Sequence, residues 1–362
     1  MVVIELVNVL GLDIGGANTK AAFLKAQDGA VKELVTLLEY FPIWKRKERL
    51  PEVLDGLKNR LVGLSVLDGV GVTITAELSD AYVTKKDGIY HVLDCMCHVF
   101  GEVPIFVLDV ESNMLSVEEA LKMPLCVASA NWVATGWMVK QIVKTCIVLD
   151  VGSTTTSIIP VIDGKIVAEG KTDLEKLQNG ELVYSGVLRT NIAAIVDGVP
   201  IRGRLTRVSS ELFSQSGDVH LLLGNIKEDE YTAETCDGRG KTVLEAASRL
   251  VRVVCADTDM LTQQEIWDMA NFVYGKQVEQ IACGLSQVLE RMRSKVRNVP
   301  VVVTGIGREF LGQKAAERCG FDDVLDMNVL LGDGVAVGSP SVGVALMAAE
   351  CLEEKSIKWM RF

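Results

Sequence analysis

Two aspartates of this chain are each followed by a short turn of glycine, hydroxyl and amide residues. The stretches read "LDIGGANTK" from Leu12 and "LDVGSTTTS" from Leu149. A turn with so little side-chain bulk presents backbone N–H groups to a phosphate, and Ser or Thr hydroxyls add further donors. A carboxylate is tolerated beside a phosphate when Mg²⁺ lies between them. The two stretches therefore predict a magnesium-assisted phosphate site, with Asp13 and Asp150 as metal ligands and catalytic groups on opposite sides of a cleft.

The phosphate itself is expected to be held by the residues of the two turns. These residues are Gly15, Gly16, Asn18, Thr19 and Lys20 in the first, and Gly152, Ser153, Thr154, Thr155 and Thr156 in the second. The alternative is that each stretch is an ordinary hairpin turn, which is a common structure. The matched pair, one turn at the start of each half, favours the phosphate site.

The elements that must position these turns are two similar β-hairpins. Apolar strands flank each turn, over residues 9–24 and 146–162, and this duplication predicts two like α/β domains, 1–143 and 144–340. Residues 69–78 and 103–110 are predicted strands, and 51–64 an amphipathic helix. Helical spacing of apolar residues over 266–296 predicts a long helix. A buried strand follows and ends at Gly305 and Gly307, and a helix over 310–321 comes after it. The two glycines are also expected to contact the phosphate.

Two further segments complete the expected organisation. Residues 171–243 are charged and rich in turns, and they are interpreted as an insertion in the second domain. A last helix, over residues 341–355, is expected to pack back on the first domain.

Composition narrows the class of protein. The chain has 362 residues, 49% of them hydrophobic, and a net charge of −11, which argues against a nucleic-acid or anionic-membrane surface. No apolar run approaches the length of a membrane span, and the start lacks the features of a secretion signal. Nine cysteines scattered through apolar segments suit reduced thiols. These features predict a cytoplasmic enzyme acting on a small phosphorylated molecule, and they leave open whether it forms a homo-oligomer.

The two aspartate-turn stretches resemble the phosphate-1 and phosphate-2 signatures of the actin, sugar kinase and heat-shock ATPase superfamily. Within it, "GDVHLLLGNI" (217–226), "TGIGREFLGQKAAERCGF" (304–321) and "ITAELSDAY" (74–82) are similar to segments of hydantoinase/oxoprolinase proteins. This resemblance spans nearly the whole chain. It implies two RNase-H-like domains around a phosphate-binding cleft.

A narrower resemblance is carried by "TAELSDAY", "SANWVATG", "SGVLRTNI" and "DGRGKT" together with the two turns. This combination is similar to proteins of archaeal and methylotroph C1-carrier pathways, among them the methanofuran-biosynthesis synthases. The resemblance implies a transferase that joins an aminomethylfuran-methyl diphosphate to the phenol of γ-glutamyltyramine and releases diphosphate. The alternatives are an ATP-dependent small-molecule kinase, a hydantoinase/oxoprolinase-like hydrolase, or a non-catalytic nucleotide-dependent switch.

One stretch departs from the superfamily's pattern. Kinases place a glycine-rich adenosine turn after the late strand, where this chain reads "GIGREF" with the charged residues Arg308 and Glu309. ATP is the ligand that the superfamily implies, and this departure argues against it while leaving the phosphate site intact. Mg²⁺ is the expected cofactor.

The resemblance also suggests catalytic and substrate residues. A phenol needs a base at neutral pH, and Glu77 is favoured because the superfamily places its catalytic acid after this strand; the alternative is a solvated carboxylate or a helix cap. Asp218 is expected to face the cleft from a strand that also carries His220, although a lone histidine is more often a packed one. A locally basic group in the insertion could hold diphosphate or the γ-glutamyl carboxylates, with ordinary surface charge as the alternative for most of its members. Arg189 is the favoured member, and the others are Arg202, Arg204, Arg207, Arg239 and Lys241.

Two other groups of residues are weaker candidates for a substrate or metal site. Asn131 and Trp132 are expected to line an aromatic substrate, with a core position as the alternative for the tryptophan. "HVLDCMCH" (91–98) suggests zinc, but the spacing of Cys95 and Cys97 is compressed, so buried thiols are favoured over a metal site.

Overall fold

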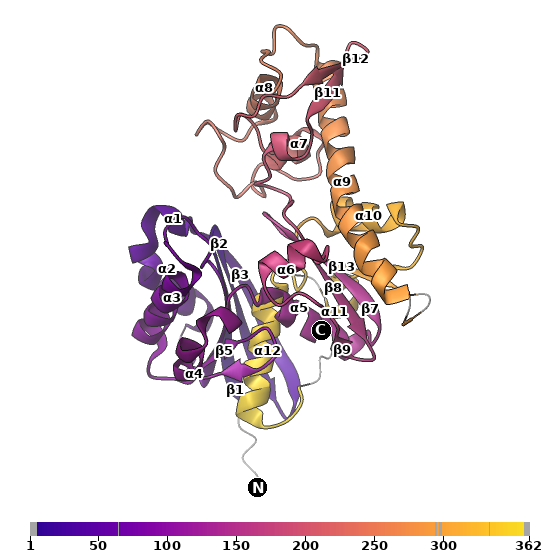
Figure 1. Cartoon of the computed structure of the whole chain (residues 1–362). Helices are drawn as coiled ribbons and strands as arrows, with labels where there is room; N and C mark the ends of the chain where they lie inside the picture. The colour runs from indigo at the N-terminus through magenta and orange to yellow at the C-terminus, as the bar shows by residue number, and fades with distance from the viewer. Residues whose placement is uncertain (1–5, 64, 294, 297–298, 333, 358–362) are drawn as a thin grey trace. The chain divides into compact units, whose positions relative to one another are not determined.

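The computed structural model describes residues 6–63, 65–293, 295–296, 299–332 and 334–357. The chain divides into two compact units. The first contains the chain up to Cys146, the segment Ile159–Glu175 and the chain from Met327 on. The second contains Ile147–Ile158 and Lys176–Asp326. Each unit is built on a mixed sheet with helices, which confirms the α/β class (Figure 1).

The sheet of the first unit has six strands in the order β3-β2-β1-β4-β5-β6. Their bounds are β1 (Val7–Gly15), β2 (Asn18–Gln27), β3 (Ala30–Tyr40), β4 (Gly69–Thr75), β5 (Ile105–Leu108) and β6 (Met114–Leu115). The first hairpin is antiparallel as predicted, whereas β1, β4 and β5 are mutually parallel neighbours. The carboxyl ends of β1 and β4 therefore meet at one edge of the sheet.

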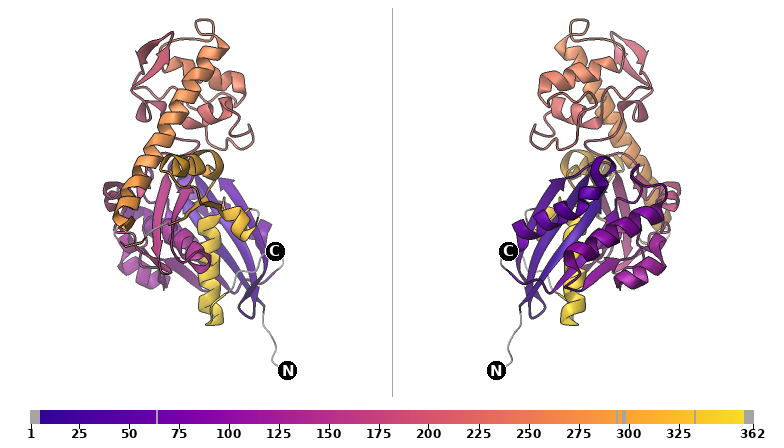
Figure 2. Two further views of the ribbon diagram at one scale, coloured as in Figure 1. Left: turned by 90° about the vertical axis from the view of Figure 1, so that its right-hand side faces the viewer. Right: turned by 90° about the vertical axis from the view of Figure 1, so that its left-hand side faces the viewer.

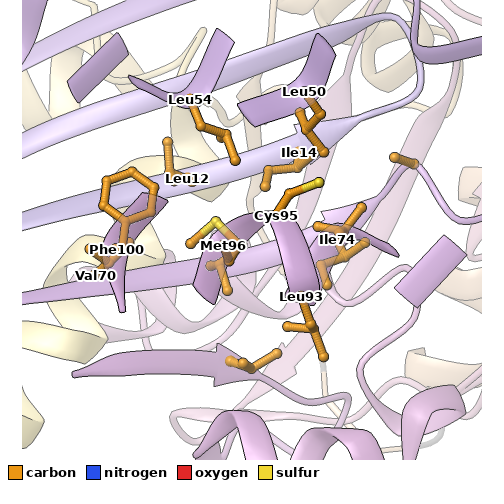
Figure 3. Close-up of a cluster of buried hydrophobic side chains, with 14 of the residues drawn as sticks. Leu12, Ile14, Leu50, Leu54, Val70, Ile74, Leu93, Cys95, Met96 and Phe100 are labelled. Carbon is orange, nitrogen blue, oxygen red and sulfur yellow. The ribbon is translucent and has the colours of Figure 1, made fainter. Parts of the chain in front are cut away.

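Helices cover both faces of this sheet. The helices of this unit are α1 (Ile43–Arg46), η1 (Lys47–Arg49), α2 (Leu50–Val62), α3 (Lys85–Phe100), α4 (Val117–Lys122), η2 (Pro124–Cys126), α5 (Asn131–Ile142), α11 (Met327–Leu331) and α12 (Ser339–Glu353). On one face, Leu12 and Ile14 of β1 pack with residues of α2 and α3 in a single apolar core (Figure 3). Since side chains alternate along a strand, Gly11 and Asp13 point to the opposite face.

The opposite face carries α12, which lies along β1 and β4 (Figure 1). A Cβ on Gly11 would meet Ser341 and would lie 2.7 Å from Cβ of Ala345. At the other end, Leu352 lies near Gly69, so α12 runs antiparallel to β1. Glycine in the strand is thus what lets the helix approach so closely.

The second unit is built on a sheet with the order β10-β8-β7-β13-β14, and β9 pairs with β8. The bounds are β7 (Cys146–Val151), β8 (Thr156–Ile162), β9 (Lys165–Ile166), β10 (Leu182–Val183), β13 (Val301–Thr304) and β14 (Val324–Asp326). The chain passes from the second unit to the first within β8, after Ile158, so β9 belongs to the first unit. It returns to the second unit within α6 (Asp173–Gln178), after Glu175. Strands β7 and β13 are parallel, and Asp150 pairs with Thr304.

The remaining elements of the second unit include the expected insertion. They are η3 (Ile192–Ala194), β11 (Gly198–Ile201), β12 (Arg204–Arg207), α7 (Ser216–Leu222), α8 (Val243–Arg252), α9 (Gln263–Arg293), the π-helical turn η4 (Arg308–Gly312) and α10 (Gln313–Arg318). The long helix α9 contacts β11 near one end and α10 near the other (Figure 2). It therefore connects the insertion with the second sheet.

The structure shows one secondary-structure prediction to be wrong. Residues 217–222, expected as a strand, form most of α7. The helix begins with a reciprocal pair of contacts between Gln215 and Asp218, the capping box that stabilises a first turn. An alternation of only four residues did not distinguish a strand from a helix that is buried all round.

None of the described helices is both long enough and apolar enough to cross a membrane.

Candidate active site

The first turn lies at the carboxyl edge of the first sheet. Asp13 pairs across the hairpin with Lys20, whose Nζ lies 3.5 Å from Oδ2 of the aspartate. Thr75, at the end of β4, directs its hydroxyl to the carbonyl of Ile14, the residue after Asp13, at 3.5 Å. Lys20, expected at a phosphate, thus forms an ion pair with the expected metal ligand.

Asp13 is buried, with 4% of its surface exposed. Burial raises the pKa of its carboxyl above the usual range, while the charge of Lys20 opposes this shift. Its Oδ1 is buried and has no hydrogen-bond partner among the described residues, and the same is true of Oγ1 of Thr73, the residue paired with Asp13 on β4. Two unsatisfied oxygens therefore occur on neighbouring strands.

These oxygens suit a hard cation. Mg²⁺ prefers carboxylate and other oxygen ligands, and a buried oxygen without a donor is costly unless something neutralises it. The residues at the end of β1 and β4 therefore fit the ion that the sequence implies.

The second turn, in the other unit, is held by a segment that follows β10. The backbone N–H of Val187 donates to the carbonyl of Gly152, and those of Leu188 and Arg189 donate to the carbonyl of Ser153. Nη1 of Arg189 also donates to Oγ1 of Thr154 at 3.4 Å. The carbonyls of Gly152 and Ser153 thus accept from protein donors, and a guanidinium is placed beside the hydroxyl of Thr154.

Gly186 makes this arrangement possible. Its carbonyl accepts hydrogen bonds from Ser216 (2.8 Å), Gln277 (2.8 Å) and Thr190 (3.2 Å). Three donors on one carbonyl fix the segment against the turn. In contrast, the hydroxyl of Thr156 donates to the carbonyl of Ser185 at 2.8 Å. Its one proton is therefore used in a hydrogen bond within the protein and not offered to a phosphate.

The late glycines lie against the same turn. The N–H of Gly307 donates to the carbonyl of Val151 at 3.0 Å. Gly305 has a φ of 85°, a backbone conformation that favours glycine, and a Cβ there would lie 2.7 Å from Oδ1 of Asp150. After the glycines, Nε of Arg308 donates to Asp326 at 3.0 Å. In the second unit, Asp150, the turn, Arg189 and the two glycines are therefore brought together.

Glu77 lies just beyond the end of β4 and is 1% exposed. Its Oε1 accepts a hydrogen bond from Ser129 at 2.6 Å and lies 3.4 Å from Nζ of Lys85. Burial raises the pKa of Glu77 above its usual value, and the contacts with Ser129 and Lys85 only partly offset this.

Asp218 and His220 have structural partners in the insertion. Asp218 is fully buried and pairs with the equally buried Arg249 at 2.8 Å. His220 is neutral, since burial lowers its pKa to about 4. Its Nδ1 accepts from Asn225 and its Nε2 donates to Gln277 at 2.9 Å. The packed histidine considered from the sequence is what the structure contains.

Trp132 is 2% exposed and Asn131 is half-buried at the start of α5, where its side chain accepts from the N–H of Trp132. This burial favours the core alternative for the tryptophan. Cys95 is part of the core beneath the sheet (Figure 3), while Cys97 and His98 on the same helix are exposed. Within the described residues no group of three or more potential ligands could hold a metal ion of this kind.

Several residues of these sites were not anticipated from sequence. They are Lys85, Ser129, Asp173, Gly186, Ser216 and Gln277. Ser129 and Gly186 lie in the quoted stretches "SANWVATG" and "SGVLRTNI", so the resemblance had pointed to their neighbourhood. The others come from distant segments with no local signal.

Comparison with known proteins shows the family of the chain. The hydantoinase/oxoprolinase family profile matches residues 68–350. A protein of Methanocaldococcus jannaschii, (4-{4-[2-(gamma-L-glutamylamino)ethyl]phenoxymethyl}furan-2-yl)methanamine synthase, is 38% identical over 347 residues, covering 96% of this chain and 99% of that protein. A synthase of the same name from Methanococcus vannielii is 33% identical over 218 residues, covering 60% of this chain and 96% of that protein.

Among solved structures, acetone carboxylase without nucleotide is similar, with a TM-score of 0.54 and 12% identity. The match covers 94% of this chain and 70% of that one. This likeness concerns the fold alone, and it agrees with the α/β fold class expected from the sequence.

Proposed function

Because the chain belongs to the hydantoinase/oxoprolinase family, we propose that it is a methanofuran-biosynthesis synthase. It condenses an aminomethylfuran-methyl diphosphate with the phenol of γ-glutamyltyramine and releases diphosphate. The name of the relative from Methanocaldococcus jannaschii describes the corresponding product, in which a phenoxymethyl group joins a phenol oxygen to a furan. Forming that ether requires a leaving group on the methylene carbon and a base for the phenol.

The observation that carries the proposal is the contact between Arg189 and the second turn. A leaving diphosphate gains negative charge as the C–O bond breaks, and fixed donors aimed at that charge lower the barrier. The hydroxyl of Thr154 and the guanidinium of Arg189 are held together by backbone bonds to Ser153. They form a donor set suited to phosphate oxygens.

Each unit also carries a candidate acidic ligand for Mg²⁺, Asp13 in the first unit and Asp150 in the second. Bound Mg²⁺ would neutralise negative charge on the diphosphate. Glu77 is the proposed base, because burial raises its pKa toward the range in which a carboxylate removes protons well. ATP is not part of the proposed reaction, since Arg308 and Asp326 form an ion pair just after the late glycines.

The proposal is tested by incubating the protein with Mg²⁺, γ-glutamyltyramine and the furan diphosphate. We expect diphosphate release matched one to one by the ether product, detected by mass spectrometry. Stabilisation by ATP in a thermal-shift assay, with no diphosphate release, would instead support the kinase alternative.

A variant of Arg189 tests its contact with the second turn. Arg189→Ala is expected to lower kcat/KM by about 10-fold to 100-fold, the loss of one charge-assisted contact. Arg204→Ala, at an exposed arginine of β12, is the matched control and is expected to retain activity. Equal activity of both variants would remove the support that the second turn gives to the proposal.

A further inference from the structure

A four-residue polar cluster in the first unit surrounds Glu77. Oγ of Ser129 lies 2.6 Å from Oε1 of Glu77 and 2.8 Å from Oδ2 of Asp173. Nζ of Lys85 lies 2.7 Å from the same oxygen of Asp173 and 3.4 Å from Oε1 of Glu77. We propose that Ser129 and Asp173 form a proton outlet for Glu77, that is, a route by which Glu77 passes a proton to solvent. Lys85 determines which of the two carboxyl groups, Glu77 or Asp173, holds the shared proton. This inference rests on the proposed role of Glu77 as the base.

The first argument is a count of protons. Three oxygens, from Glu77, Ser129 and Asp173, make two contacts of hydrogen-bond length, and each contact needs one hydrogen. The serine hydroxyl supplies only one, and an ionised carboxylate can only accept. The second hydrogen must therefore lie on one of the two carboxyl groups, so the cluster holds a shared proton.

The second argument is the difference between the two carboxyl groups. The side chain of Glu77 is fully buried, whereas that of Asp173 is 21% exposed and in contact with the ammonium of Lys85. The ammonium stabilises a negative charge on Asp173, so the proton rests on Glu77 in the free protein. The carboxylate of Asp173 is therefore in contact with solvent, whereas the side chain of Glu77 is covered in the free protein.

The third argument is the backbone of Ser129. Its φ is 53°, in the left-handed region, which is strained for a residue other than glycine. The position is held by a hydrogen bond from the N–H of Ser129 to the carbonyl of Ile74, in the strand that leads to Glu77. The fold thus retains a strained serine at the one place where its hydroxyl joins both carboxyl groups.

The charged groups around Glu77 come from different elements. Lys85 is supplied by α3 and Asp173 by α6, and Ser129 by the segment before α5. The positive charge of Lys85 lowers the pKa of Glu77, and the negative charge of Asp173 raises it. The hydrogen bond to Asp173 and the charge of Glu77 raise the pKa of Lys85 above its usual value, although burial opposes this.

These contacts give a balanced sequence of proton transfers. Glu77 first passes its proton through Ser129 to Asp173, which becomes neutral. The phenol O–H bond then breaks and its proton adds to the free Oε2 of Glu77, which has no partner among the described residues. The phenolate oxygen attacks the methylene carbon as diphosphate leaves with the bonding electrons. Asp173 finally loses its proton to water and pairs again with Lys85.

The test is the pH dependence of kcat/KM. Activity needs ionised Glu77, so the rate falls on the acidic side of its pKa. We expect Asp173→Asn to move this acidic limb to lower pH and Lys85→Met to move it to higher pH, because the two changes remove opposite charges. Ser129→Gly, which accepts the positive φ, is expected to slow turnover by at least about tenfold, since general acid–base catalysis is worth about 100-fold or more.

Ser112→Gly is the matched control, because Ser112 also has a positive φ (71°) in the same unit and lies outside the cluster. It is expected to behave like the wild type. Shifts of the same sign in Asp173→Asn and Lys85→Met, or full activity of Ser129→Gly while Glu77→Gln is inactive, would overturn the outlet and leave the proposed function standing.

A measurement without turnover separates the two ideas. Infrared spectra of the free protein at neutral pH are expected to show the C=O band of a protonated carboxylic acid that Glu77→Gln lacks. If this band is present while no diphosphate is released, the outlet stands and the proposed function fails. If Glu77→Gln and Asp173→Asn both leave the band region unchanged, the cluster holds no shared proton and the inference is wrong.

Discussion

Gly186 lies directly against Thr154: a Cβ on the glycine would be 2.6 Å from both the backbone nitrogen and the carbonyl carbon of the threonine. No real side chain fits at that distance, so the segment that carries Arg189 can follow the second turn only with glycine here. The turn and the arginine are therefore positioned by one close backbone approach.

Replacing this glycine should damage the phosphate site. Gly186→Ala is expected to weaken the binding of inorganic diphosphate with Mg²⁺ by roughly tenfold or more, because the added methyl group must displace the turn; a tenfold loss corresponds to about 1.4 kcal/mol. Isothermal titration calorimetry measures this. Gly275→Ala, in α9 with open space around it, is the control and should bind as the wild type does. Unchanged binding by Gly186→Ala would show that diphosphate is held elsewhere.

The buried pair of Asp218 and Arg249 should matter for stability. Arg249→Met leaves a buried carboxylate without its partner, and such a loss typically costs about 3–5 kcal/mol. Urea denaturation of the purified protein gives this difference. Arg202→Met, which breaks an exposed pair with Glu265, should cost only about 0–1 kcal/mol. Similar costs for the two variants would contradict the structural role assigned to the buried pair.

His220 should make stability depend on pH. Its folded-state pKa is lowered from 6.5 to about 4, so below pH 6.5 the unfolded chain binds a proton that the folded protein does not. The free energy of unfolding therefore decreases as the pH falls from about 6.5 to 4, by up to about 3 kcal/mol from this group. Urea denaturation at several pH values, compared with His220→Gln, isolates this contribution. Parallel pH curves for the two proteins would show that His220 does not contribute.

The packing of α12 on β1 should be intolerant of side chains at Gly11. Gly11→Ala places a methyl group against Ser341 and Ala345, and overpacking of this kind costs about 1–3 kcal/mol or more. Thermal unfolding followed by circular dichroism reports the loss. Gly56→Ala, in α2 with no neighbour within 4 Å, should be neutral or slightly stabilising. Wild-type stability of Gly11→Ala would mean that the helix can move away without cost.

Local patterns were enough to predict much of the fold. The hairpins around Asp13 and Asp150, the helix α2 and the long helix α9 follow from apolar periodicity and turn residues alone. The error at residues 217–222 has a local cause as well. Gln215 and Asp218 cap a short helix whose burial on all sides leaves no polar face to identify it.

The surroundings of the candidate catalytic residue depend on distant contacts. Ser129 is 52 residues from Glu77 and 44 from Asp173 along the chain, so no local spacing joins them. Gln277 likewise reaches Gly186 across 91 residues. Glu77 and Arg189 were identified because their own stretches resemble a known family, whereas their supporting partners are determined only by tertiary structure.

The position of α12 has a consequence for synthesis. The first sheet receives this covering helix only after the ribosome has made the whole of the second unit, since about 180 residues separate Cys146 from Met327. At a synthesis rate of roughly 5–20 residues per second, the face of β1 that carries Gly11 and Asp13 stays without α12 on the order of 10 s or longer. The second unit can begin to fold in that interval, so the order in which the two units mature is the reverse of the order in which their first strands are made.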